Sequence, residues 1–425
     1  MSDRPSEGSR TFALSERIEG MSMSIRALLT HNESFDDNRA VCGVVGLSAI
    51  GNGGSVIQPM LVGGMVDTLG FSPSMAGYVV AAEMSAFALC SLLLFARIHM
   101  FNRRMVAAIG GLTFIGANLV SIFADSFVLL CMARAVAGIG SSLAIAVYYT
   151  TVAAMRKPEQ VFAFVQATSI SYSGLFLLIA PWILSNWGLP GAFIFLAVSA
   201  SCAMAVVKWI PRRRVEVAGV GGPKNQMSAK MLFANLTAVL TLLCFMVMYV
   251  GHGAIWPYQE RLGVLHGFDQ ESIGKALGFS MLIWGVLGSG LSMIQGLKLK
   301  SLLPLVLSFL LSILAAILLI VGKSYGVYSA ASALVAFSWF YGLPYLKGIM
   351  AAIDRDGRVL VAGGVMFPIG LALGPMLAAS VVNHGGVVSV AWLGVFCYCL
   401  CLALIIVPAA KVDGYLRSKA SDTVP

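Results

Sequence analysis

Charged residues are scarce in this sequence. They make up 11% of its 425 residues, whereas soluble domains carry about 25%. Hydrophobic residues make up 58%, and the mean hydropathy is +0.87. A soluble globular protein does not combine so little charge with so much apolar surface, so the composition indicates a polytopic membrane protein.

Sequence motifs for catalysis and metal binding are also missing. All eight cysteines fall in apolar segments, and none belongs to a Cys-x-x-Cys pair or a Cys/His cluster with metal spacing. No glycine-rich loop ends in Lys-Ser or Lys-Thr, so we do not expect the chain to hydrolyse ATP. No Ser/His/Asp pattern stands out either. We therefore expect no enzyme activity, no metal and no cofactor.

Apolar runs, separated by charges and by Gly/Pro turns, predict an all-α membrane protein with twelve spans. Most are at least as long as the roughly 20 residues that a helix needs to cross a bilayer. The expected spans cover residues 40–66, 74–96, 104–124, 127–154, 160–185, 190–210, 232–257, 271–296, 301–321, 325–350, 359–382 and 387–410.

Lysine and arginine are distributed unevenly between the two sides of these spans. Twenty-four of the 28 fall in the tails and in the loops that share one side. Because basic loops stay in the cytoplasm, both termini are expected there, with the protein in the inner (plasma) membrane. The net charge of +9 then follows from topology, and no nucleic-acid partner is expected.

The two halves of the chain resemble each other. Gly51-Asn52-Gly53 with Pro59 in the first span is matched by Gly251-His252-Gly253 with Pro257 in the seventh. Broken helices at matching places are typical of transporters that rock around a central site. The expected parts are a cytoplasmic tail (1–39), a six-helix bundle (40–210), a cytoplasmic linker (211–231), a second six-helix bundle (232–410) and a cytoplasmic tail (411–425).

The fourth span contains one charge, Arg134, followed by Gly138 and Gly140. A guanidinium within the hydrocarbon costs about 2.5–3.5 kcal/mol on insertion scales, so it needs a partner. The two glycines let another helix pack closely. The pattern Arg-x-x-x-Gly-x-Gly resembles the fourth-helix motif of the major facilitator superfamily, with Ala137 where the family usually has Gln. The resemblance implies a secondary transporter built from two pseudo-symmetric six-helix bundles.

Two further family motifs are present in part. The family has Gly-x-x-x-Asp-Arg-x-Gly-Arg-Arg between its second and third helices, and here Arg103 and Arg104 match its end. The pattern Gly-x-x-x-Gly-Pro, which antiporters of the family carry in the fifth helix, lies in the eleventh span as Gly370, Gly374 and Pro375. We expect structural or gating roles for these residues, and the chain does not resemble a typical drug/proton antiporter.

Glu83 is the one carboxylate expected deep within a span. It lies about 14 Å from the outer start of the second span, and Arg134 lies about 12 Å from the same face. The similar depths predict an ion pair, in which each charge lowers the cost of burying the other. Glu83 then either exchanges a proton during transport or serves only as a permanent structural partner of Arg134.

Substrate contacts are expected from polar and aromatic residues of three spans. The family lines its central cavity with the first and seventh helices, which here carry Asn52, Gln58, His252 and Trp256. The tenth span adds an aromatic group, which suits a flat apolar solute: Trp339, Tyr341 and Tyr345. The alternative is ordinary hydrogen bonding for His252 and core packing for the aromatic group. Glu260 and Arg261 are expected in an outer loop, outside the site.

These residues predict a secondary transporter that moves a small organic solute by alternating access, with protons as the coupling ion. Efflux of a hydrophobic compound is the alternative within transport, and a transporter-like sensor or scaffold is the alternative outside it. The expected partners are the solute, protons and the lipid bilayer, and the chain is expected to act as a monomer.

Overall fold

The computed structural model describes residues 35, 37–95, 97–211, 235–295, 301–353 and 358–421. Within these ranges the regular elements are all helices, so the expected all-α fold is confirmed. They are α2 (Asn38–Val56), α3 (Gln58–Leu69), α4 (Pro73–Phe95), η1 (Ile98–Met100), α5 (Arg103–Ser121), α6 (Phe127–Val152), α7 (Pro158–Val207), α9 (Leu236–Leu265), α10 (Gln270–Phe279), η2 (Ser280–Gly285, a π-helix), α11 (Val286–Gln295), α12 (Leu302–Val321), α13 (Tyr325–Ile353), α14 (Arg358–Gly385) and α15 (Val388–Ser421). The predicted linker beyond Pro211 and most of the predicted N-terminal tail lie outside the described residues.

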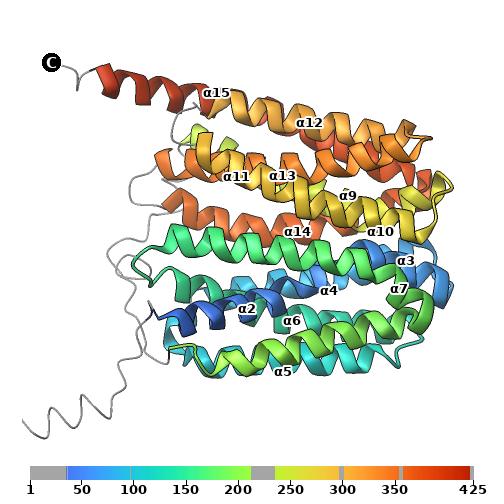
Figure 1. Cartoon of the computed structure of the whole chain (residues 1–425). Helices are drawn as coiled ribbons and strands as arrows, with labels where there is room; N and C mark the ends of the chain where they lie inside the picture. Colours follow the sequence, from blue (N-terminus) through green and yellow to red (C-terminus); the bar gives the residue numbers. More distant parts are fainter. Residues whose placement is uncertain are drawn as a thin grey trace, which may run out of the picture.

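The number of membrane spans follows from helix length. Ten helices of the described chain are long and apolar enough to cross a bilayer, when α10, η2 and α11 are counted as one, and α2 with α3, bent by 45°, makes an eleventh. α7 has 50 residues, about 75 Å if straight, whereas the hydrocarbon core is about 30 Å thick. Gly188 breaks α7 with a φ of 60°. Figure 1 shows that the α7 ribbon turns back on itself. Counting α7 as two spans gives the twelve that the sequence predicts.

Several helix ends differ from the predicted limits. α9 continues eight residues beyond Pro257, to Leu265, because proline is tolerated inside membrane helices. α15 continues to Ser421, so the first part of the predicted C-terminal tail is helical. The first predicted span is bent at Ile57, one residue before α3 begins.

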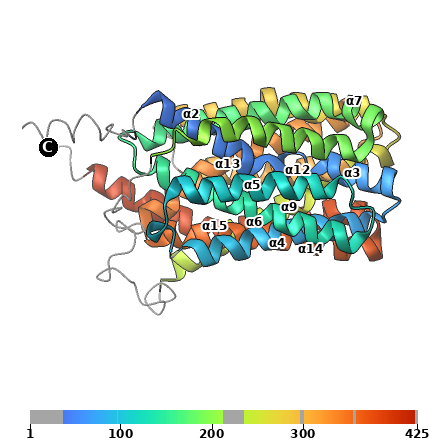
Figure 2. The ribbon, with the colours of Figure 1, turned by 90° about the horizontal axis from the view of Figure 1, so that it is seen from below.

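The helices form two groups that run roughly parallel to one axis (Figures 1 and 2). α2 to α7 form the first half and α9 to α15 the second, which lies above the first in Figure 1. The halves pack together through α4 on α14, α7 on α10, and α3 on α9. α2, by contrast, packs on α5, α6 and α7 of its own half.

The described chain begins and ends at the same end of the bundle, on the left in Figure 1. We call the opposite end, where α3 meets α9, the distal end. The first span therefore contacts the second half through its distal part, α3, which brings residues near positions 67 and 260 together.

Candidate functional site

A buried ion pair lies inside the first half. Arg134 donates from Nε to Glu83 Oε2 at 3.1 Å and from its terminal nitrogen to Oε1 at 2.7 Å. Its other terminal nitrogen donates to Asn118 Oδ1 at 2.9 Å, and the guanidinium lies 5.5 Å from the centre of the Phe193 ring. All three polar side chains are buried. The pair predicted from depth is present, and the geometry satisfies both carboxylate oxygens.

Glycines allow the helices around this pair to approach closely. A Cβ on Gly138 of α6 would lie 2.1 Å from the backbone oxygen of Glu83, and one on Gly140 would lie 2.6 Å from the nitrogen of Phe114 in α5. The two glycines thus face different neighbours, α4 and α5. Gly54 of α2 faces the carboxylate itself, since its Cβ would lie 2.1 Å from Glu83 Oε1.

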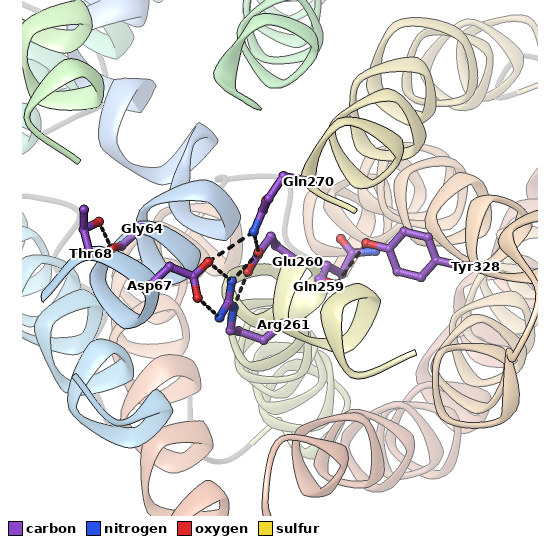
Figure 3. Close-up of polar contacts among 8 residues, drawn as sticks. All are labelled: Gly64, Asp67, Thr68, Gln259, Glu260, Arg261, Gln270 and Tyr328. Atoms are coloured by element: carbon purple, nitrogen blue, oxygen red, sulfur yellow. Dashed lines mark hydrogen bonds and ion pairs between the residues drawn. The ribbon is translucent and has the colours of Figure 1, made fainter. Parts of the chain in front are cut away.

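A second charged cluster joins the halves at the distal end (Figure 3). Arg261 of α9 makes two hydrogen bonds of 2.7 Å to the carboxylate of Asp67 in α3. The same guanidinium makes two of 2.5 Å to Glu260. Gln270, at the start of α10, donates to Glu260 at 2.5 Å and to Asp67 at 3.3 Å. We call these four residues the Arg261 cluster.

Burial within the Arg261 cluster is graded. The side chain of Glu260 is fully buried, that of Arg261 is 6% exposed, and that of Asp67 is 53% exposed. Gly63 of α3 makes room for Glu260, because a Cβ there would lie 2.6 Å from the carboxylate. Glu260 is thus held between two helices that belong to different halves.

The sequence prediction that placed Glu260 and Arg261 in an outer loop was wrong. It ended the seventh span at Pro257, whereas α9 runs to Leu265. The sequence contained a usable signal: Asp67 directly follows the first predicted span and Glu260-Arg261 follow the seventh, at matching places in the two halves. Charges at matching span ends of a two-fold repeat are candidates for mutual contact.

Two more hydrogen bonds join the halves near the distal end. Pro59 has no N–H, so the carbonyl of Ser55 lacks its helical donor. The indole nitrogen of Trp256 in α9 donates to that carbonyl at 2.9 Å. The hydroxyl of Tyr258 donates to the carbonyl of Pro73 in α4 at 3.0 Å. A side chain of the other half thus satisfies the carbonyl that the break in the first span leaves without a helical donor.

Aromatic rings surround His252 below this contact. The His252 ring stacks on Trp339 of α13 with centroids 3.7 Å apart, and on Trp256 at 6.1 Å. Trp339 also meets Tyr249 edge-on at 4.8 Å. His252 and Trp339 are each partly exposed.

Tyr341 and Tyr345 lie apart from this stack. Both are buried, and the Tyr341 hydroxyl donates to Gln295 of α11 at 2.8 Å, within the second half. Gln58 is buried at the start of α3, and its Nε2 has no partner among the described residues. Asn52 donates to the carbonyl of Ser48, one turn earlier in α2.

The residues of the partial loop motif bind backbone of the first half. Arg104 donates to the carbonyl of Ile210 at 3.0 and 2.8 Å, and Arg103 donates to that of Thr150 at 3.4 Å. They connect the start of α5 to the ends of α7 and α6.

The glycines of α14 pack on the backbone of α9. A Cβ on Gly370 would lie 2.5 Å from the carbonyl oxygen of Met246, and one on Gly374 would lie 2.8 Å from that of Val250. The neighbouring Pro375 faces Gly253 of α9. This contact resembles the one that Gly138 makes in the first half. Over the described ranges no group of three or more His, Cys, Asp or Glu is placed to hold a metal ion.

Comparison with known proteins agrees with this architecture. The family model of the Major Facilitator Superfamily matches residues 43–352. The chain belongs to this superfamily. No curated protein matches the sequence significantly. Among solved structures, the human organic anion transporter MFSD10 (TETRAN) has a TM-score of 0.58 at 16% identity, over 85% of this chain and 99% of that one. At this identity the likeness concerns the fold.

Proposed function

We propose that this protein is a secondary transporter that moves a small organic solute across the inner (plasma) membrane by alternating access. The observation that carries the proposal is the Arg261 cluster, which joins the two halves at one end of the bundle. Trp256 and Tyr258 add contacts between the halves at the same end. Rocking of the halves would break these contacts and open the distal end.

The excess of basic residues gives the orientation. We assign the end that carries the termini to the cytoplasm, with the distal end outside. The conformation is then closed to the outside by the Arg261 cluster. α2 is the cytoplasmic part of the first span, and its main packing partners all belong to its own half. This arrangement fits an opening toward the cytoplasm.

We further propose that protons drive the cycle, and the geometry favours Glu260 over Glu83 as the coupling carboxylate. Glu83, Arg134 and Asn118 belong to the first half alone, so rocking leaves their contacts intact. Glu260 shares Arg261 with Asp67 of the other half. Opening the distal end separates these groups and changes the surroundings of Glu260, as coupling to a proton requires.

The aromatic rings around His252 suggest the substrate class. The partly exposed His252 and Trp339 suit a flat organic solute, and the similarly folded MFSD10 is an organic anion transporter. Efflux of a hydrophobic compound is the second candidate, because the same rings would bind it. We expect the chain to act as a monomer in the bilayer, without a nucleic-acid partner or a cofactor.

Reconstitution into liposomes tests the proposal. Solutes that raise the unfolding temperature of the purified protein are selected from acids, aromatics and drugs, and their flux is measured with and without a pH gradient. We expect solute flux in both conditions, and we expect it to be faster when a pH gradient is imposed. Binding without flux under every gradient would support the sensor or scaffold alternative.

A further inference from the structure

Within the second half, α9 and α13 pack along one line, which we call the α9–α13 seam. Two contacts fix its alignment. His252 of α9 stacks on Trp339 of α13 with ring centroids 3.7 Å apart, and a Cβ on Gly263 of α9 would lie 3.0 Å from Cζ of Tyr328 in α13. The steps from 252 to 263 and from 339 back to 328 are equally long. The two helices are therefore antiparallel here and advance in step.

This alignment places Gln259 of α9 opposite Ser332 of α13. Gln259 lies four residues before Gly263, and Ser332 lies four residues after Tyr328. Each also lies seven residues from the stacked ring of its own helix. Residues four and seven apart share one face of a helix, so both side chains point into the seam. A direct contact supports this placement: the Tyr328 hydroxyl donates to the backbone carbonyl of Gln259 at 3.0 Å (Figure 3).

Gln259 and Ser332 carry buried polar groups that lack a partner. Neither the amide nitrogen nor the amide oxygen of Gln259 has a hydrogen-bond partner among the described residues, although the residue is fully buried. The same holds for the hydroxyl of Ser332, which is 2% exposed. Such groups are costly to bury unsatisfied, and most in folded proteins bind either protein or ordered water. The two residues therefore need a further hydrogen-bonding group between them.

Water fits the chemistry of this place. The Gln259 amide can donate and accept, the Ser332 hydroxyl can do either, and the Tyr328 oxygen can still accept a bond after donating its proton. These three partners match the roughly three hydrogen bonds that a buried water makes. An ion would find no Asp, Glu, Lys or Arg at the facing positions of the seam, which are His252, Trp256, Gln259 and Gly263 on α9, and Tyr328, Ser332, Val335 and Trp339 on α13.

We propose that the α9–α13 seam contains a binding site for water, in which a bound water molecule links the Gln259 amide to the Ser332 hydroxyl. The inference is independent of the proposed transport function. A water that bridges two buried polar groups is nearly as favourable in enthalpy as a direct hydrogen bond. The bridge thus ties α13, which carries Trp339, to α9, which carries Arg261.

X-ray footprinting of the purified protein detects such a water. X-rays form hydroxyl radicals from water, these oxidise the side chains beside it, and mass spectrometry identifies the oxidised residues. For the wild type we expect oxidation of Tyr328, although this residue is fully buried, because the bound water lies next to it. Phe176, which is buried in the first half against Phe195, is the dry control and should stay unmodified.

Two substitutions remove the polar groups that hold the water. Gln259→Leu and Ser332→Ala should each lower the oxidation of Tyr328, and the double variant should reduce it to the level of Phe176. Ser332→Ala deletes a single hydroxyl, so the test remains valid if Gln259→Leu does not fold. Val335→Ala, at the next position of the seam, is the matched control. It removes apolar packing but no hydrogen-bonding group, and it should not lower the oxidation of Tyr328.

Thermal unfolding tests whether one water links the two residues. Each single variant leaves the other polar group without its bridge and should lower the unfolding temperature, whereas the double variant leaves neither group stranded. We therefore expect the double variant to lose less than the two single variants together. The inference is overturned if Tyr328 of the wild type is not oxidised, if its oxidation persists in the double variant, or if the losses of unfolding temperature are additive.

Discussion

Arg261 of α9 binds Asp67 of α3 through two hydrogen bonds of 2.7 Å, although 194 residues separate them in the sequence. The contact joins the first span of one half to the first span of the other. Glu260 accepts two further hydrogen bonds from the same guanidinium. The proposed rocking of the halves would therefore have to separate Asp67 from Arg261.

The first prediction concerns the buried pair in the first half. Glu83→Gln leaves the Arg134 guanidinium buried without its carboxylate, and the free energy of unfolding should fall by about 3–5 kcal/mol. The double variant Glu83→Gln/Arg134→Met removes the stranded charge and should recover most of that loss. Unfolding in detergent, followed by circular dichroism, measures both. A stable Glu83→Gln that exchanges solute but cannot accumulate it would instead return the coupling role to Glu83.

The second prediction assigns coupling to the Arg261 cluster. Glu260→Gln keeps the shape of the side chain and the bond from Arg261 to Asp67, but it cannot release a proton. We expect solute exchange to continue while uphill accumulation driven by a pH gradient is lost. Parallel assays of counterflow and of gradient-driven uptake in liposomes make the comparison. Unchanged accumulation by this variant would exclude Glu260 from coupling.

The third prediction concerns the glycine motif of α6. Gly138→Ala places a Cβ 2.1 Å from a backbone oxygen of α4, so the helices must separate, at a cost of about 1–3 kcal/mol. Gly116→Ala in α5 is the control, since nothing lies within 4 Å of its Cβ position. We expect a lower unfolding temperature for the first variant and an equal or higher one for the second. Equal stability of the two variants would show that close packing at Gly138 is unimportant.

The fourth prediction concerns orientation. In a cysteine-free background, Asp125→Cys and Ser324→Cys lie at the distal end and should react with an impermeant thiol reagent added outside intact cells. Glu159→Cys, near the start of α7, should react only after the membrane is opened. Reaction of Glu159→Cys from outside would reverse the topology that the basic residues indicate.

Much of the architecture was predictable because bilayer thickness and the cost of burying charge act on local sequence. Apolar run length gave the spans, and similar depths predicted that Glu83 meets Arg134. The contact between Asp67 and Arg261 was missed because the prediction let Pro257 end the seventh span. Proline ends helices in water far more strictly than in a membrane, where neighbouring groups satisfy the freed carbonyl.

The direction in which each side chain points was the second feature that could not be predicted from the sequence. Trp339 and Tyr341 are two residues apart, so a helix points them to different faces. The structure turns Trp339 to His252 and Tyr341 to Gln295. An aromatic run alone does not show which ring faces the other half, since that depends on how α13 is rotated against its neighbours.

The most direct test of alternating access is the response of both ends to Asp67→Ala. The Asp67 side chain is 53% exposed and Arg261 keeps Glu260, so the variant should fold normally. Glu271→Ala, which removes only the exposed pair with Lys275, is the matched control. Spin labels at positions 125 and 324 report the distal end, and labels at 159 and 411 report the other end, by double electron–electron resonance in lipid bilayers. The account predicts that Asp67→Ala adds longer distal distances together with shorter distances at the other end, while Glu271→Ala matches the wild type. Wild-type distances at both ends in a folded Asp67→Ala protein would contradict it.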